Sequence, residues 1–346
     1  MGATLGQIAK RVGLSVPAVS YALSDDPAKR RQVSRDTVAR VMRVARSMGY
    51  RRNASATATA TGRTNAIALL QSVVGRRSNL PPEMLRGIHD ALEPLGMHLI
   101  LSRLSDERLV DDAVVPKILT HVMADGLLVD YNDEVPQAML ELIRRHRIPA
   151  VWLNFKQDMD CVRPDDFGAG EMVTRRLIEA GHRRITYLQL LPLSHYSGAD
   201  RRSGYESAMR KAGLPIRMIV SPEYMPMGER VNMLATMLRD ADRSTAFVAY
   251  GEEAHSAVLA AMKVGLSLPR DLSVITFAGE AGRRDAAQLA FAVIPEHACG
   301  KVGVEMLLRR IEKRRAAPVP TITLPFDFHA GATFGPAPAG SSRKSR

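Results

Sequence analysis

TLGQIAKRVGLSVPAVSYALS, residues 4–24, predicts two short helices joined by a tight turn. Thr4 opens a capping box, and apolar residues follow it at helical intervals. Gly13 can adopt the left-handed conformation that ends a helix, and Ser15 can cap a second helix that has Pro17 in its first turn. A helix, a short glycine turn and a second helix form a helix-turn-helix, whose second helix enters the major groove of DNA.

The positive charge of the chain is concentrated at its two ends. Residues 1–64 contain twelve Lys or Arg against three Asp, a balance of +9, and the last six residues add +3. Because the whole chain carries +12, residues 65–340 are neutral. A merely solvated basic surface would spread its charge more evenly. The segregation therefore predicts a nucleic-acid-binding head on a neutral body.

Composition and motifs exclude several classes of protein. With 46% hydrophobic and 24% charged residues, the chain resembles a soluble globular protein. It shows no apolar run that would span a membrane and no secretory signal, so we expect a cytoplasmic, nucleoid-associated protein without a membrane partner. Cys161 and Cys299 are isolated, which fits neither a disulfide framework nor a metal site. No phosphate loop or nucleophile elbow is present, so we expect no enzyme activity, cofactor or metal.

Residues 65–335 alternate short apolar strands with amphipathic helices. This pattern predicts parallel, doubly wound sheets, which bind ligands at the carboxyl ends of their strands. A break near NFKQDMDCVRPDD, residues 154–166, divides the units into two lobes. The predicted fold is an N-terminal all-α head followed by an α/β domain of two doubly wound lobes. Residues 336–346 are expected to form a disordered basic tail.

Both regions resemble the lactose-repressor (LacI/GalR) family of bacterial transcription regulators. The head motifs are the turn VGLS, the opening VSRDT of a third helix capped by Ser34, and the closing GYRRNA. In the body, RGIHDAL, ADGLLV, IPAVWLN, RRSGYESAM and LPRDLSVITF match the family's effector domain, which is similar to periplasmic sugar-binding proteins. The resemblance covers residues 3–335. One departure is the loop SDDPAKRRQ, residues 24–32, which is longer than usual.

The resemblance implies a DNA-binding domain over residues 1–50 and a hinge over residues 51–64. Base reading would fall to Val16, Pro17 and Tyr21, none of which can form a bidentate hydrogen bond with a base. Val16 could instead pack inward. Together with phosphate-contacting and hinge positions, the predicted DNA-binding residues are Thr4, Ser15, Val16, Pro17, Ala18, Ser20, Tyr21, Ser34, Thr37, Asn53, Ala56 and Thr59.

For residues 65–335 the resemblance implies effector binding and dimerisation, with three chain crossings between the lobes. Asp165, Arg201 and Tyr224 match ligand-binding positions of the family, although Arg201 could instead be a surface residue. Several polar positions of the family are replaced here by aromatic or apolar residues, and Glu252 or Glu253 could substitute for a missing Asp. The predicted effector-binding residues are Asp165, Arg201, Tyr224, Tyr250, Glu252 and Phe277.

The predicted function is sequence-specific transcriptional regulation, as a repressor. The expected partners are a pseudo-palindromic double-stranded operator, a second copy of the chain, and a small effector, either sugar-like or of another class. Two alternatives remain open. The body could have lost small-molecule sensing and serve for dimerisation alone, or the chain could be a solute-binding protein. The second alternative would require an export signal and would not explain the basic head. A tetramer is not excluded by the sequence.

NASATATATGRT, residues 53–64, occupies the place of the family's hinge helix. In the family, a Leu from each of two hinge helices wedges into the operator's minor groove. The aligned residue here is Thr59, flanked by Ala56 and Ala60. Thr is short and polar, so it is a poor wedge, and the Ala/Thr mixture is only marginally helical. We expect this segment to be disordered without DNA and to fold on binding.

Thr59→Leu should increase both the bending of the operator and the affinity for it. Unstacking a base step costs about a few kcal/mol, and a larger apolar wedge recovers more of that cost. Gel-mobility phasing of operator complexes measures the bend. No change on substitution would show that this segment does not enter the minor groove.

Overall fold

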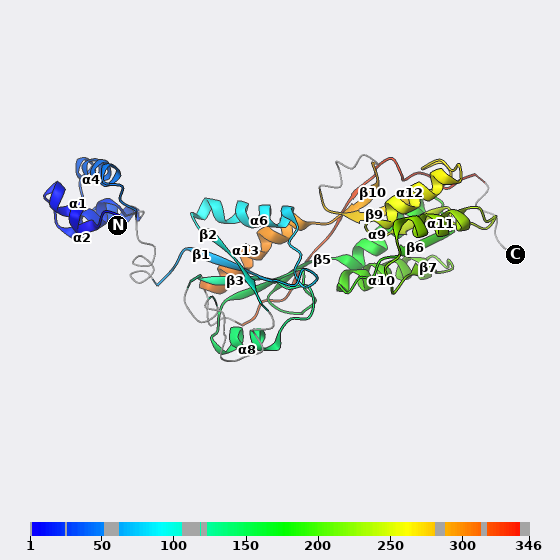
Figure 1. The fold of residues 1–346 in the computed structure, drawn as a ribbon, viewed down its shortest axis with the longest axis horizontal. Coiled ribbons are helices and arrows are strands. Elements are labelled where there is room, and N and C mark those ends of the chain that lie inside the picture. The colour runs from blue at the N-terminus through cyan, green and yellow to red at the C-terminus, as the bar shows by residue number, and fades with distance from the viewer. Residues whose placement is uncertain are drawn as a thin grey trace. The chain divides into compact units, whose positions relative to one another are not determined.

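The computed structural model describes residues 2–24, 26–51, 62–105, 118, 123–280, 288–312 and 317–339. The chain divides into two compact units, Met1–Thr64 and Asn65–Arg346 (Figure 1). Asn53, Ala56 and Thr59 lie outside the described residues, as does the end of the basic tail. None of the described helices is both long and apolar enough to cross a membrane.

The first unit folds around the helix-turn-helix. The buried side chains of Ile8, Val19 and Val41 form the centre of its core. Gly13 ends the first helix with φ 67°, and the Thr4 capping box is complete, so both expectations are confirmed. The helices described in this unit are α1 (Leu5–Val12), α2 (Val16–Ala22), α3 (Pro27–Arg30) and α4 (Arg35–Ser47).

Helix α3 lies within the long SDDPAKRRQ segment, which the sequence analysis treated as a loop. The Asp26 side chain accepts a hydrogen bond from the Ala28 N–H at 2.8 Å, and Pro27 occupies the first turn. A cap and a proline at the first helical position suffice for one helical turn. The inserted residues are therefore partly helical.

The first lobe of the second unit is built on a parallel sheet. Its described strands follow the order β11-β5-β4-β3-β1-β2. Ile67 and Leu69 pack on one face of this sheet, against α6 and α13, whereas Ala68 and Leu70 pack on the other, near α8. The elements are β1 (Ala66–Ser72), α6 (Pro82–Leu92), η1 (Glu93–Leu95), β2 (His98–Leu104), β3 (Gly126–Asp130), α8 (Gln137–Arg145), β4 (Ala150–Leu153), β5 (Cys161–Pro164), α13 (Glu296–Glu312) and β11 (Ile322–Leu324).

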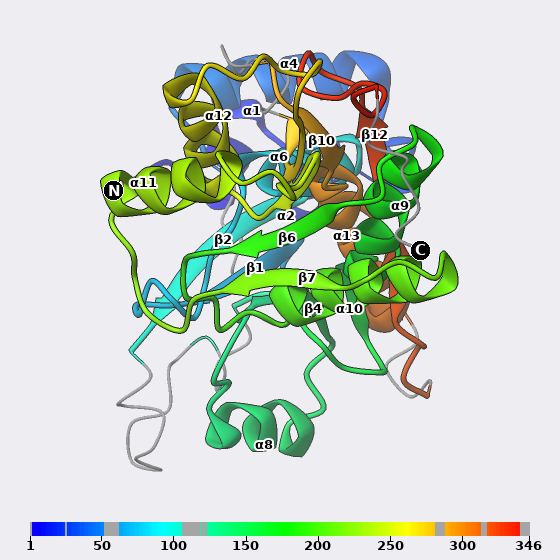
Figure 2. The ribbon, with the colours of Figure 1, turned by 90° about the vertical axis from the view of Figure 1, so that its right-hand side faces the viewer.

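The second lobe contains a sheet of the order β12-β10-β9-β8-β6-β7 in the described chain. Helices α9 and α10 cover one face and α11 and α12 the other (Figure 2). The elements are α9 (Asp166–Glu179), β6 (Ile185–Gln189), α10 (Tyr196–Lys211), β7 (Arg217–Val220), α11 (Met227–Leu238), β8 (Ala246–Ala249), α12 (Glu253–Lys263), β9 (Ser273–Ala278), β10 (Ala290–Val293) and β12 (Asp327–His329).

One strand departs from the expected parallel arrangement, because β12 is antiparallel to β10. The chain reaches β12 directly from the first lobe, without the helical crossover that joins parallel neighbours within one sheet. The remaining pairs of both sheets are parallel, and the two-lobed fold predicted from the sequence is confirmed.

Within the described residues the chain passes between the lobes at three places, as expected. The crossings join β5 to α9, β10 to α13, and β11 to β12. Because α13 packs on the first sheet and β11 pairs with β5, the first lobe receives its last two elements from the end of the chain.

Helices α9 and α10 approach closely through glycines. A Cβ atom on Gly204 would lie 2.1 Å from the Phe167 carbonyl oxygen, and one on Gly170 would lie 2.0 Å from the Arg201 carbonyl oxygen. These distances leave no room for a side chain, so the two backbones can be this close only with glycine at both positions.

Gly204→Ala should lower the free energy of unfolding by about 1–3 kcal/mol or more, because the two helix backbones must separate. Chemical denaturation of the full chain measures the change. Gly228→Ala is the matched control: Gly228 lies in α11, and a Cβ there would have no atom within 4 Å. Equal stability of the two variants would contradict the close-packing argument.

Candidate DNA-binding surface and effector site

Helix α2 buries one side in the head and exposes the other. Val19 and Ala22 are buried, whereas Ala18, Ser20 and Tyr21 are partly exposed. Val16 is 45% exposed, so the alternative in which it packs inward is wrong. The base-reading positions expected from the sequence thus remain accessible, and their contact with DNA stays a prediction.

The predicted phosphate-contacting residues include three helix caps. The hydroxyl groups of Thr4, Ser15 and Ser34 accept backbone N–H groups at 3.3, 3.4 and 3.2 Å, each at the start of a helix. The Ser34 hydroxyl also donates to the Thr37 hydroxyl at 2.9 Å. All three caps are exposed. Helix N-termini carry partial positive charge and favour phosphate, so this placement suits the predicted role.

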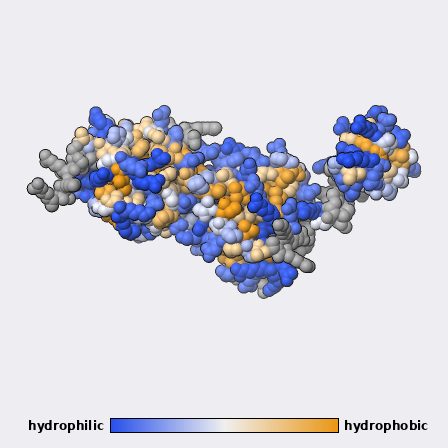
Figure 3. All heavy atoms as spheres, turned by 180° about the vertical axis from the view of Figure 1, so that it is seen from behind, coloured by the Kyte–Doolittle hydropathy of each residue, from blue (hydrophilic) through white to orange (hydrophobic). Residues whose placement is uncertain are grey.

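The basic side chains of the head face solvent. On the side drawn in Figure 3, hydrophilic residues surround a smaller hydrophobic patch on this unit. Exposed guanidinium and ammonium groups without carboxylate partners can bind phosphates in exchange for counterions. Among the described residues of the head, no ion pair involves the exposed side chains of Lys10, Arg11, Lys29, Arg30, Arg31, Arg35, Arg40, Arg43, Arg46 and Arg51.

In the second lobe, Arg201 lies at the centre of a buried cluster. Its side chain belongs to α10 and is only 4% exposed, so the alternative of a surface arginine is wrong. Its Nε donates to Asp166 Oδ1 at 2.8 Å. The guanidinium carbon lies 4.7, 4.6 and 5.6 Å from the ring centres of Tyr250, Phe277 and Phe326. The structure therefore brings together three of the predicted effector residues, Arg201, Tyr250 and Phe277, and their contact with an effector stays a prediction.

The carboxylate beside Arg201 belongs to Asp166, which the sequence analysis did not single out. Asp165, the predicted ligand residue, caps α9 and accepts the Gly168 N–H at 2.9 Å. Asp166 is buried, and its Oδ2 atom has no hydrogen-bond partner in the described protein. A buried charged oxygen requires a partner, so Asp166 Oδ2 is the acceptor in this cluster that a ligand could satisfy.

A chain of hydrogen bonds connects this cluster to the first lobe. The Tyr250 hydroxyl lies 2.9 Å from Ser197 Oγ, which lies 2.7 Å from His195 Nδ1. His195 Nε2 then contacts the Asn154 carbonyl oxygen at 3.2 Å, and the Tyr196 hydroxyl donates to Asn154 Oδ1 at 2.8 Å. Burial lowers the pKa of His195, which favours its neutral form. Of these residues the sequence pointed only to Tyr250, because the others come from segments that no motif connects.

Two predicted effector residues lie apart from Arg201. Tyr224 is 68% exposed in the segment before α11, and no hydrogen bond or ring contact in the described chain joins it to the cluster. The Glu252 side chain is 71% exposed and lies 3.7 Å from Arg230. The neighbouring Glu253 is the buried carboxylate instead, and it accepts the N–H groups of Leu190 and Leu191 at 3.0 Å each.

Comparison with known proteins places these features in one family. Residues 4–53 match the family described as "Bacterial regulatory proteins, lacI family", and residues 174–334 match the "Periplasmic binding protein-like domain". The HTH-type transcriptional repressor PurR of Edwardsiella ictaluri (strain 93-146) is 30% identical over 327 residues, which cover 90% of this chain and 92% of that protein. The chain belongs to the LacI family.

Other similar proteins and solved structures agree with this family membership. The PurR repressor of Photorhabdus laumondii subsp. laumondii is 28% identical over 327 residues, covering 90% of this chain and 92% of the relative. A Lac repressor structure bound to ONPG aligns with a TM-score of 0.76 at 19% identity, over 96% of this chain and all of that one. A complex of the regulator CelR with cellobiose aligns with a TM-score of 0.62 at 22% identity, over 96% of this chain and 100% of the CelR chain. These structures share the two-lobed fold.

The LacI-family protein is thus a DNA-binding transcriptional regulator, which confirms the function predicted from its sequence. Members of the family are regulators rather than enzymes. The head provides the helix-turn-helix, and the body provides the periplasmic-binding-protein-like domain.

Tyr21→Ala should weaken operator binding by about 1–3 kcal/mol while leaving binding to random DNA nearly unchanged, because Tyr21 is predicted to contact a base edge. The operator is first obtained by selection from random duplexes, and both affinities are then measured by fluorescence anisotropy. Lys10→Ala, which removes an exposed charge from α1, is the comparison and should weaken both complexes alike. Equal losses on the two DNAs for Tyr21→Ala would assign Tyr21 to phosphate contact or packing.

Proposed function

We propose that this regulator represses transcription as a homodimer on a pseudo-palindromic operator. One recognition helix of seven residues offers few base contacts, and pairing two heads doubles them. The relatives named PurR are transcriptional repressors, which supports this assignment. In this proposal residues 1–50 bind the operator, residues 51–64 form the hinge, and residues 65–335 sense the effector and dimerise. The protein acts in the cytoplasm, at the nucleoid.

The buried Arg201 cluster is the observation that supports effector binding. Asp166 Oδ2 has no hydrogen-bond partner among the described residues, and the side-chain hydrogen bond that Arg201 makes there comes from its Nε atom. A ligand at this position requires an acceptor for the guanidinium and a donor for the carboxylate. Tyr250 and Phe277 add flat apolar faces, which stack against a ring.

We infer that the effector is a small polar ring compound with fewer hydroxyl contacts than a sugar. Structural neighbours include a LacI-family regulator from Enterococcus faecium with bound ribose, at a TM-score of 0.61, and the CelR–cellobiose complex. In this chain, Tyr250-Gly251 and Phe277-Ala278 occupy positions where the family resemblance places polar residues that grip hydroxyl groups. The change favours stacking over multiple hydrogen bonds.

The cluster is also placed to couple ligand binding to lobe closure. Asp166 is the first residue of α9, directly after the crossing from β5, and Phe326 lies on the crossing between β11 and β12. The hydrogen-bond chain from Tyr250 ends at Asn154 of the first lobe. A ligand that binds one lobe arrangement more tightly than another shifts their populations, and in a dimer this changes the spacing of the two heads.

A thermal-shift screen of polar ring metabolites on the full-length protein tests the proposal. A compound that binds only the folded state must raise the melting temperature. The compounds found are then tested for their effect on operator binding. If no compound shifts the melting temperature or operator affinity, the result contradicts the inferred effector class and favours a body that serves for dimerisation alone.

Phe277→Leu should weaken binding of an effector found in this way by about two- to tenfold, because a stacked ring contact contributes about 0.5–1.5 kcal/mol beyond its buried area. Isothermal titration calorimetry measures the affinity. Phe291→Leu is the matched control, since Phe291 is a buried ring on the neighbouring strand β10 outside the cluster. Equal affinities of the two variants would place the effector elsewhere.

The two adjacent aspartates are separated by a second pair of variants. Asp165→Asn preserves a good helix cap and should leave effector affinity unchanged. Asp166→Asn removes the carboxylate acceptor and should weaken it. If Asp165→Asn weakens effector binding and Asp166→Asn does not, the ligand contacts Asp165 instead.

A further inference from the structure

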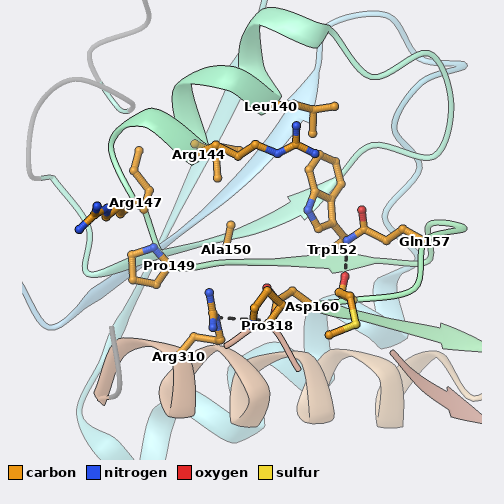
Figure 4. A pocket seen from close by; sticks show the side chains of 13 residues that line it. Leu140, Arg144, Arg147, Pro149, Ala150, Trp152, Gln157, Asp160, Arg310 and Pro318 are labelled. Atoms are coloured by element: carbon orange, nitrogen blue, oxygen red, sulfur yellow. Dashed lines mark hydrogen bonds and ion pairs between the residues drawn. The ribbon is translucent and has the colours of Figure 1, made fainter. Parts of the chain in front are cut away.

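The first lobe contains a cavity that shares no residue with the Arg201 cluster. Its volume is about 380 Å³, within the range of small-molecule sites. Helix α8 and strand β4 form two of its walls. The segment after β4, the end of α13 and Pro318 complete it (Figure 4).

An indole forms part of the apolar surface of this cavity. Trp152 lies on β4 and is 5% exposed, and it is the only tryptophan of the sequence. Its ring extends into the cavity opposite Pro149, with Leu140 of α8 on the same wall as Arg144 (Figure 4). A flat aromatic face of this kind packs against other planar groups.

The charge on the cavity wall is positive, because three arginines line it against one aspartate. That aspartate, Asp160, already accepts the Val319 N–H at 2.9 Å and lies 3.5 Å from Arg310 Nε. The Arg144 side chain has no hydrogen bond or ion pair within the part of the chain that the structure describes. Its guanidinium extends alongside the Trp152 ring (Figure 4). A cation with no side-chain partner among the described residues therefore lies next to a flat apolar surface.

We propose that this cavity binds a small organic anion with a flat apolar body, of the aromatic carboxylate class. The carboxylate pairs with the Arg144 guanidinium, whose planar fork matches two carboxylate oxygens. The ring packs on Trp152 and the neighbouring aliphatic side chains. The site is independent of the proposed effector at Arg201, and either can exist without the other.

Fluorescence of the single tryptophan reports binding directly in the full-length protein. Titration with benzoate should produce a saturable change in Trp152 emission. Benzamide has the same ring without the charge and should bind at least tenfold more weakly, and inorganic phosphate, which lacks the ring, should leave the emission unchanged. Absence of a saturable change with benzoate, or equal affinity for benzamide, would overturn the proposal.

Two neighbouring arginines provide matched variants. Arg144→Gln should weaken benzoate binding about tenfold, because one charge-assisted pair is lost. Arg145→Gln removes the same charge from the same last turn of α8, at a position that does not line the cavity, and should have no effect. Equal weakening by both variants would show that benzoate responds only to the general positive charge at the end of α8. That result would refute a specific site at Arg144.

Discussion

The ion pair between Arg201 and Asp166 joins helices α9 and α10 of the second lobe, beside the carboxyl ends of strands β8 and β9. A guanidinium this deeply buried is tolerated only with a partner, and removing one member of such a pair costs about 3–5 kcal/mol. The pair can form because α9 and α10 approach through Gly170 and Gly204, and it fixes Arg201 against three aromatic rings. It also ties α10 to the first residue after a crossing between lobes. The packing of α9 on α10, the neutralisation of the buried Arg201 charge and the start of α9 after the crossing between lobes therefore meet at one contact.

The local features of the fold could be predicted from the sequence because their causes are local. Caps, the positive-φ Gly13 and the period of apolar residues act within one or two helical turns, and the structure confirms them. The antiparallel direction of β12 could not be predicted in this way, since it depends on where the preceding crossing delivers the chain.

The residues of the sites were less predictable, because their contacts depend on tertiary structure rather than on neighbours in the sequence. Asp165 and Asp166 are adjacent and chemically identical, so only the direction of each side chain from α9 decides which one meets Arg201. Glu252 and Glu253 pose the same problem at α12, where the buried member is the second. The cavity beside Trp152 gave no sequence signal at all, because its walls come from segments as distant as Leu140 and Pro318.

The crossings also impose an order on the folding of the protein during its synthesis. The head contains its whole hydrophobic core within Met1–Thr64, so it can fold while most of the chain is still unmade. The first lobe cannot, because Val304 and Leu307 of α13 complete the core around Ile67, and β11 supplies an edge strand near residue 322. Its early strands therefore leave the ribosome long before their covering helix exists. During translation the nascent protein thus carries a folded DNA-binding head while the sheet that follows it in the chain still exposes apolar surface, which makes this stage prone to aggregation.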